Sequence, residues 1–193
     1  MEYKKYIYLI ISVFFINLCI AQDKSDINKL RVTIEGKGVQ DTVKLKAIKK
    51  LVISYYMSND MDSSYYYLDL QHRFSIDRGL KKGEANALFM KAYFKTTVYE
   101  YDKAIELYEK SLDVYKSIDY KGGISPCYNN IGLSYRKKGD YTRAIDYYYK
   151  SAKIDLEIGN KKGYSSVYIN VGAIYMELGE YESAKESFTI ALN

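Results

Sequence analysis

The sequence of 193 residues contains no tryptophan, one proline, one histidine and two cysteines. His72 therefore has no second imidazole with which to share a metal, and a catalytic histidine would need a positioned partner. Walker-type loops, GxSxG, HExxH and CxxC motifs are also missing. Acidic pairs such as Asp146 with Asp155 are expected on helix surfaces, without sign of paired acid–base chemistry. We therefore predict that the chain is not an enzyme and holds neither a metal nor a cofactor.

We predict that the two cysteines do not form a disulfide with each other. Cys19 falls in an N-terminal segment that we expect to be removed, which leaves Cys127 alone, and one cysteine cannot form an internal disulfide. Cys127 stands beside Tyr128 near the start of an expected helix that needs small apolar residues. We interpret it as a packing residue and not as a reactive thiol.

The first residues have the pattern of a secretory signal peptide. Lysines precede an apolar run over residues 6–20, and small residues precede the predicted cleavage after Ala21. The run is shorter than the roughly 20 residues that a spanning helix needs, so no stable membrane insertion of the mature chain is expected. A lipoprotein site at Cys19 is the alternative, but Leu18 is larger than such sites favour. Export to the periplasm or the medium is predicted for the chain without residues 1–21.

Charge and aromatic composition also narrow the choice of partner. The net charge is +5, and lysines are interspersed with acidic residues instead of forming the clustered basic face of a nucleic-acid groove. We therefore expect no nucleic-acid partner. Tyrosine is abundant at 24 residues, against six phenylalanines. Its ring packs as an apolar group while the hydroxyl reaches a partner or water, which suits a thin two-layer structure.

The strongest signal is an internal repeat. A stretch over residues 128–151 returns 40 residues later with seven matched positions. The first copies are Tyr128, Gly132, Tyr135, Gly139, Tyr141, Ala144 and Tyr148, and the second are Tyr168, Gly172, Tyr175, Gly179, Tyr181, Ala184 and Phe188. A fixed period of 20–50 residues indicates a solenoid of stacked units.

Within each unit the pattern predicts two antiparallel helices. Glycines in the middle of a helix cost about 1 kcal/mol relative to alanine, so Gly132 is expected to allow close approach to Ala144 on the partner helix. Gly123 and Gly163 fall at the expected junctions between units, where glycine supplies positive φ or close backbone approach. Pro126 is predicted in the first turn of its helix, where the missing N–H does no harm.

The period divides the chain into a linker and four units. Residues 22–40 are expected to be a linker, with a possible extended run over residues 30–34. The units are predicted at residues 41–80, where the pattern is degenerate, and then at 81–120, 121–160 and 161–193. The last residues fall inside an expected helix, before any glycine that would end it. The array is therefore expected either to be truncated or to bind something with the apolar face of its last helices, and we favour truncation.

The pattern Tyr-x2-Ile-Gly-x2-Tyr-x3-Gly-x-Tyr-x2-Ala-x3-Tyr at 128–148 resembles the tetratricopeptide repeat. The resemblance implies an all-α, right-handed superhelical solenoid of antiparallel helix pairs. The 40-residue spacing looks like the longer variant found in cell-polarity adaptors and bacterial peptide-sensing regulators. Together with the signal peptide, the chain also resembles the N-terminal sensory regions of Bacteroidota signalling proteins, in which repeats precede a membrane helix and an output domain.

The resemblance implies a concave groove lined by the first helix of each pair. The groove residues that it implies are Phe89, Tyr93, Asn129, Asn130, Leu133, Arg136, Ile169, Asn170, Ala173 and Met176. Asn130 and Asn170 share one repeat position, and their amides could hold an extended peptide backbone through donors and acceptors; the alternative is that they cap or bridge helices locally. Where the family's carboxylate clamp would place lysine or arginine, this chain has Phe89, Tyr93, Ser166 and Asn170, so recognition of a C-terminal carboxylate is not predicted.

These observations predict a non-catalytic scaffold that binds a protein or peptide segment in its groove. The resemblance further implies the sensory part of a larger signal-transduction protein. The alternative is a structural spacer or a self-association module that uses the C-terminal face of the array.

Overall fold

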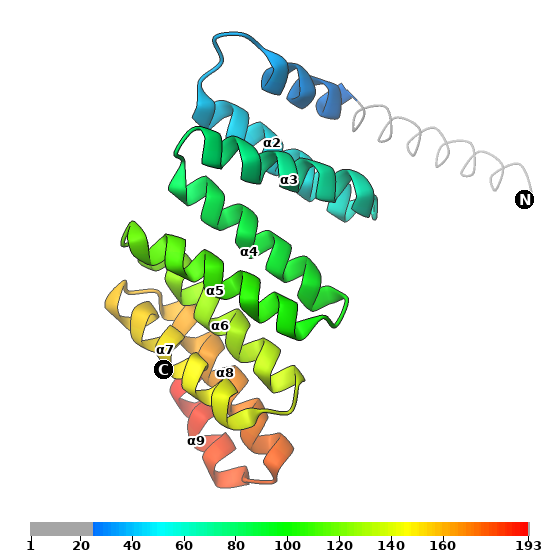
Figure 1. The fold of residues 1–193 in the computed structure, drawn as a ribbon. Coiled ribbons are helices and arrows are strands. Elements are labelled where there is room, and N and C mark those ends of the chain that lie inside the picture. The colour runs from blue at the N-terminus through cyan, green and yellow to red at the C-terminus, as the bar shows by residue number, and fades with distance from the viewer. Residues whose placement is uncertain (1–24, 193) are drawn as a thin grey trace, which may run out of the picture. The chain divides into compact units, whose positions relative to one another are not determined.

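The computed structural model describes residues 25–192, and within this range all regular structure is helical (Figure 1). A helix over residues 25–35 comes first. The eight helices that follow begin every 20 residues: α2 Asp41–Met57, α3 Met61–Asp77, α4 Lys81–Thr97, α5 Tyr101–Ser117, α6 Lys121–Lys137, α7 Tyr141–Glu157, α8 Lys161–Leu178 and α9 Tyr181–Leu192. No helix in this described range is both long and apolar enough to cross a membrane. The predicted signal peptide, residues 1–21, lies outside the described residues.

The chain divides into two compact units, up to residue 71 and from residue 72 onward. In the first unit, the expectation of a linker over residues 22–40 is wrong for residues 25–35, which are helical and not extended. Arg31 explains why this helix is ordered. Its guanidinium donates to the hydroxyls of Tyr55 at 2.7 Å and Tyr67 at 3.0 Å, and these two rings stack with centroids 5.5 Å apart.

The connections between the helices share one backbone feature, a residue in the left-handed region. From α2 to α9 each connection has a single residue with positive φ, again at intervals of 20 residues: Asn59, Gly79, Tyr99, Asp119, Gly139, Gly159 and Gly179. A left-handed residue just after a helix lets the chain reverse direction while the last carbonyls keep hydrogen-bond partners. Four of these positions carry glycine, for which the conformation has little cost.

Tyr99 departs most from this preference, because a bulky residue at φ 62° is strained. Its side chain is 78% exposed and has an edge contact with Tyr101, so little burial would be lost on replacement. We expect Tyr99→Gly to raise the free energy of unfolding by about 0.5–1 kcal/mol, as the relief of left-handed strain exceeds the entropy of glycine in the unfolded chain. Urea unfolding followed by circular dichroism measures the change.

The control for this prediction is Val98→Gly in the same turn. Val98 has φ −105°, which any residue adopts, so glycine there should only lower stability. Equal losses in the two variants would contradict the strain argument.

The glycines at the junctions between pairs lie inside the first turns of helices, where they permit close approach and not a reversal of the chain. A Cβ on Gly123 would lie 2.5 Å from the Tyr115 ring, and one on Gly163 would lie 2.6 Å from Asp155 Oδ2. The expectation for Pro126 is wrong, since it is the sixth residue of α6 and lies in the second turn. There the missing N–H leaves the carbonyl four residues earlier without its usual helical donor.

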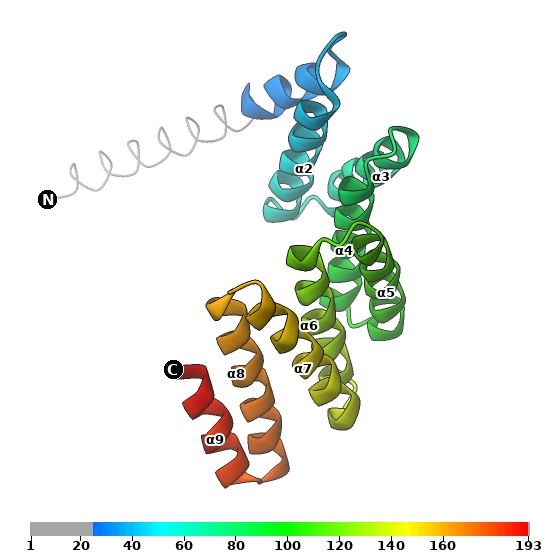
Figure 2. The same cartoon turned by 90° about the vertical axis from the view of Figure 1, so that its left-hand side faces the viewer.

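The second unit is built from the hairpins α4–α5, α6–α7 and α8–α9, which follow one another in Figure 2. Its core contains fully buried tyrosines, Tyr108 and Tyr148. A Cβ on Gly132 would lie 2.9 Å from the Tyr148 ring and 3.1 Å from the Ala144 carbonyl oxygen. Gly132 therefore allows close approach, as predicted, but its nearest neighbour is a ring of the partner helix and not the Ala144 side chain.

The first helices of these pairs form one layer. Direct contacts join α4 to α6 and α6 to α8, and no comparable contact joins α5 to α7 or α7 to α9 among the described helices. In a curved stack the layer whose members lie closer together is on the inside. The helices α4, α6 and α8, called the inner layer below, are thus the candidates to line a concave surface.

Candidate functional site

All ten residues predicted to line the groove lie on the inner layer, but their surroundings differ. Ile169 and Met176 on α8 are 51% and 49% exposed, and Tyr93 on α4 is 37% exposed. Leu133 and Ala173 are half-buried. Phe89, by contrast, packs against the core, where its ring meets that of Tyr108 at 5.2 Å between centroids.

Arg136 forms an ion pair within the array. Its guanidinium donates to Glu177 Oε1 at 2.5 Å, which links α6 to α8. This hydrogen bond is the main reason that the pKa of Glu177 lies below its usual range. The positive charge of Arg136 is therefore already matched, which makes it a link between repeats.

The amides of Asn130 and Asn170 each donate a hydrogen bond within the array. Asn130 Nδ2 donates to the Pro126 carbonyl at 2.8 Å, one turn earlier in the same helix. Asn170 Nδ2 donates instead to Asn129 Oδ1 at 3.2 Å and bridges α8 to α6. The alternative of local bridging therefore describes these donors. Each of the three side chains still has one amide atom without a hydrogen-bond partner among residues 25–192: Oδ1 in Asn130 and Asn170, and Nδ2 in Asn129.

A cavity of about 310 Å³ adjoins Asn129 and Asn130, between the N-terminal halves of α6 and α8. Its other walls include Asp155 of α7 and Asn160, which precedes α8. Asp155 is only 1% exposed, so the expectation that it lies on a helix surface is wrong. Sequence reasoning missed this site. The available signal was the break in the repeat, because residue 115, the copy of position 155 one unit earlier, is a tyrosine.

The α8 end of the cavity is held by the Asn160 side chain. Its Oδ1 accepts from the Gly163 backbone N–H at 3.1 Å and so caps the helix, while its Nδ2 donates to Asp155 Oδ1 at 2.7 Å. Behind them, the hydroxyls of Ser125 and Ser151 lie 3.0 Å apart, and Ser151 also donates to the Ser125 carbonyl at 2.9 Å. The polar groups of this wall are therefore fixed before any partner binds.

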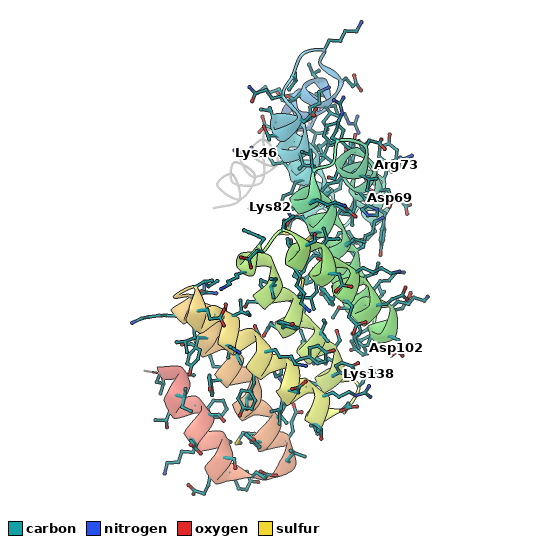
Figure 3. All side chains as sticks on the ribbon, turned by 60° about the vertical axis from the view of Figure 1, so that its left-hand side comes forward. Lys46, Asp69, Arg73, Lys82, Asp102 and Lys138 are labelled. Carbon is teal, nitrogen blue, oxygen red and sulfur yellow. The ribbon has the colours of Figure 1, made fainter. Side chains whose placement is uncertain are left out.

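Neighbouring pairs are also linked by charges at their edges. Lys138 after α6 and Asp102 on α5 point toward one another and form an ion pair (Figure 3). Lys121 and Glu157 form another at 3.0 Å. Exposed ion pairs of this kind contribute about 0–1 kcal/mol each to the free energy of unfolding, so they add little to the stability of the fold.

The remaining cysteine and histidine show no catalytic arrangement. Cys127 is fully buried, with its thiol 3.6 Å from Ser111 Oγ, and burial raises the pKa of this thiol to about 12. The interpretation of Cys127 as a packing residue is confirmed. His72 Nδ1 lies 3.4 Å from Lys91 Nζ. Across the described helices, no group of three or more histidine, cysteine or acidic side chains is placed to hold a metal.

The family is established by sequence. The tetratricopeptide repeat model matches residues 84–157 and 123–193, which together span more than half of the chain. The chain belongs to the tetratricopeptide repeat family. Stacked repeats of this class present extended surfaces to other proteins, so the chain is a protein–protein interaction scaffold. No curated protein sequence matches it.

Solved structures with low sequence identity share the fold. BtubC (BKLC) from P. vanneervenii aligns with a TM-score of 0.72 at 20% identity, over 88% of this chain and 73% of that one. A Rap protein complexed with Competence and Sporulation Factor aligns with a TM-score of 0.70 at 20% identity, over 92% of this chain but only 51% of the Rap chain. A putative kinesin light chain with nearly identical TPR-like repeats from Podosopora anserina aligns with a TM-score of 0.64 at 12% identity, over 89% and 86%. These likenesses confirm the all-α solenoid.

Proposed function

We propose that the chain binds an extended protein segment along the inner layer, without catalysing a reaction. The observation that carries this proposal is the combination of exposed apolar side chains with amide groups on α6 and α8. Ile169 and Met176 expose about half of their surface on this layer. Next to them, the unused donor Nδ2 of Asn129 and the unused acceptor Oδ1 of Asn170 suit a peptide backbone, which has one donor and one acceptor per residue.

The sensory role is proposed from the sequence pattern together with a solved structure of the same fold. The 40-residue spacing of the motifs and the lysine-flanked apolar run before Ala21 support an exported sensor built from the longer repeat variant. The solved Rap protein, which is complexed with Competence and Sporulation Factor, supports the use of such a fold to receive a signal. We propose that this chain is the exported, signal-receiving part of a larger signal-transduction protein.

A matched pair of substitutions tests the binding surface. Met176 on the inner layer and Val98 in a turn are both 49% exposed, so an aspartate costs similar burial at each position. Peptides selected from a random 12-residue library on the wild-type chain should lose at least tenfold in affinity on Met176→Asp, because a charge would replace an apolar contact. On Val98→Asp they should bind as before.

Melting temperatures of both variants control for folding. The proposal fails if no peptide is enriched, or if the two variants bind the selected peptides equally well. In the second case the peptides occupy a surface other than the inner layer.

A further inference from the structure

The junction between the last two hairpins differs from the one before it at two aromatic positions. Before α6, the rings of Tyr115 and Tyr120 lie 5.6 Å apart, and the Tyr115 hydroxyl donates to Asn86 Oδ1 at 2.8 Å. Forty residues later, Asp155 and Asn160 occupy the same positions. The smaller side chains leave the cavity of about 310 Å³ where the rings fill the preceding junction. This volume is at the lower end of the range for small-molecule pockets, roughly 300–1,000 Å³.

The carboxylate of Asp155 is buried beside this cavity without a cation. Its side-chain partner is the neutral amide of Asn160, and no basic residue in the described part of the chain pairs with it. A buried charge is costly unless it is paired. Lys162 also lines the cavity, but its side chain is exposed and forms no ion pair with Asp155. The carboxylate is thus placed to accept a positive charge from outside the chain.

The preceding junction contains a cation of its own. Lys82 Nζ lies 3.8 Å from the centre of the Tyr120 ring, and Lys82 is labelled in Figure 3. The residue that corresponds to Lys82 one repeat later is Gly122, which has no side chain. In the last junction the chain therefore has no counterpart of Lys82 and has gained a buried carboxylate, while Lys162 on the cavity wall is exposed and does not pair with it. Both changes favour a cation supplied by a partner.

We propose that this cavity binds an arginine side chain of the segment held on the inner layer, with Asp155 as its counter-charge. This proposal rests on the proposed function. A guanidinium is less strongly hydrated than an ammonium and presents five donors in a plane, which suits a buried carboxylate with a second acceptor on the same cavity wall. Asn160 Nδ2 donates to Asp155 Oδ1 and so orients the carboxylate, and the unused Oδ1 of Asn130 is a further acceptor on the cavity wall. Tyr115 occupies the equivalent space at the junction before α6, so that junction does not offer the same site.

The pocket can be tested without the rest of a peptide. Nα-acetyl-arginine amide, titrated into the full chain and followed by ¹⁵N NMR, should shift the backbone signals of Asn160 and Gly163 in a saturable way, with a dissociation constant in the millimolar range. Nα-acetyl-glutamine amide should not. In Asp155→Asn, which keeps the size and the contact with Asn160, affinity for the arginine probe should fall roughly tenfold or more.

A second variant fills the pocket. Asp155→Tyr introduces the ring seen at Tyr115, and Gly163 leaves room for it as Gly123 does at the earlier junction. This variant should remain helical, melt no lower than the wild type and show no binding of the arginine probe. The proposal is overturned if the wild type gives no saturable shifts, or if binding persists in Asp155→Asn or in folded Asp155→Tyr.

The peptide library separates this proposal from the proposed function. Enriched peptides should carry arginine at one position, and this preference should vanish when selection is repeated on Asp155→Asn. If peptides are enriched and remain sensitive to Met176→Asp but show no arginine preference, the pocket assignment is wrong and the groove stands. If no peptide is enriched, the groove assignment fails, and the arginine probe alone still decides the pocket.

Discussion

Replacing Tyr148 with alanine is expected to lower the free energy of unfolding by about 3–5 kcal/mol, the usual cost of removing a large buried ring. The Tyr148 side chain is fully buried on α7. It packs in a cluster with Val171 and Ile174 of the next hairpin and covers Gly132 of its own. Its loss would leave a cavity between two hairpins, which the stiff helices cannot close. Urea unfolding monitored by circular dichroism measures the effect.

Tyr148→Phe is the control for this result. The Tyr148 hydroxyl is buried and makes no hydrogen bond of good geometry, although the nearby Arg136 guanidinium partly opposes the rise in the pKa of the phenol that burial causes. Removing such a group is expected to be neutral or slightly stabilising. Phe188 holds the same position in the next repeat. Equal losses in the Phe and Ala variants would contradict the packing argument.

The second large effect is expected at Gly132. Leucine there would force α6 away from α7, because even a methyl group would press on the buried Tyr148 ring. We expect a loss of about 3 kcal/mol, at the upper end for overpacking, in spite of the better helix propensity of leucine. The matched control is Gly122→Leu in the exposed first turn of the same helix, where the nearest group is the hydroxyl end of the Tyr120 ring at 3.2 Å and no buried ring lies in the way, so stability should change less.

The two large effects should also be coupled. In the chain that carries Gly132→Leu together with Tyr148→Ala, the leucine can occupy space that the ring has left. The combined loss should then be smaller than the sum of the single losses by about 0.5–3 kcal/mol, as found for residues in direct contact. Strict additivity would show that Gly132 and Tyr148 do not share the contact.

The helices of the array were predictable because their signals are local. Apolar periodicity and the glycines near turns depend on residues within one or two turns of a helix, and the 40-residue recurrence repeats these local patterns along the chain. The left-handed positions were visible at Gly139 and Gly179, where glycine marks the turn. They were not visible at Tyr99 or Asp119, because no sequence preference signals a strained residue that its neighbours hold in place.

The site was less predictable because its contacts join residues far apart in the chain. Arg136 meets Glu177 and Asn129 meets Asn170, each pair separated by 41 residues. A helical pattern predicts which side chains share a face. It does not predict which of them will form a hydrogen bond or an ion pair with a residue of the next repeat. Arg136 and Phe89 lie on the inner layer, but each also makes contacts within the array that the helical pattern did not show.

The sequence by itself determined the class of protein: paired helices that cannot bury their apolar faces alone and must stack. Only the tertiary structure decided the state of the polar residues. Asp155 has the sequence pattern of a surface acid, yet it is buried because Gly163 lets the first turn of α8 close over it and Asn160 supplies a hydrogen bond there. Whether a side chain is buried depends on the residues of the neighbouring helix that pack over it. For Asp155 that helix is α8, and the result is that a residue that breaks the repeat pattern becomes part of a pocket wall.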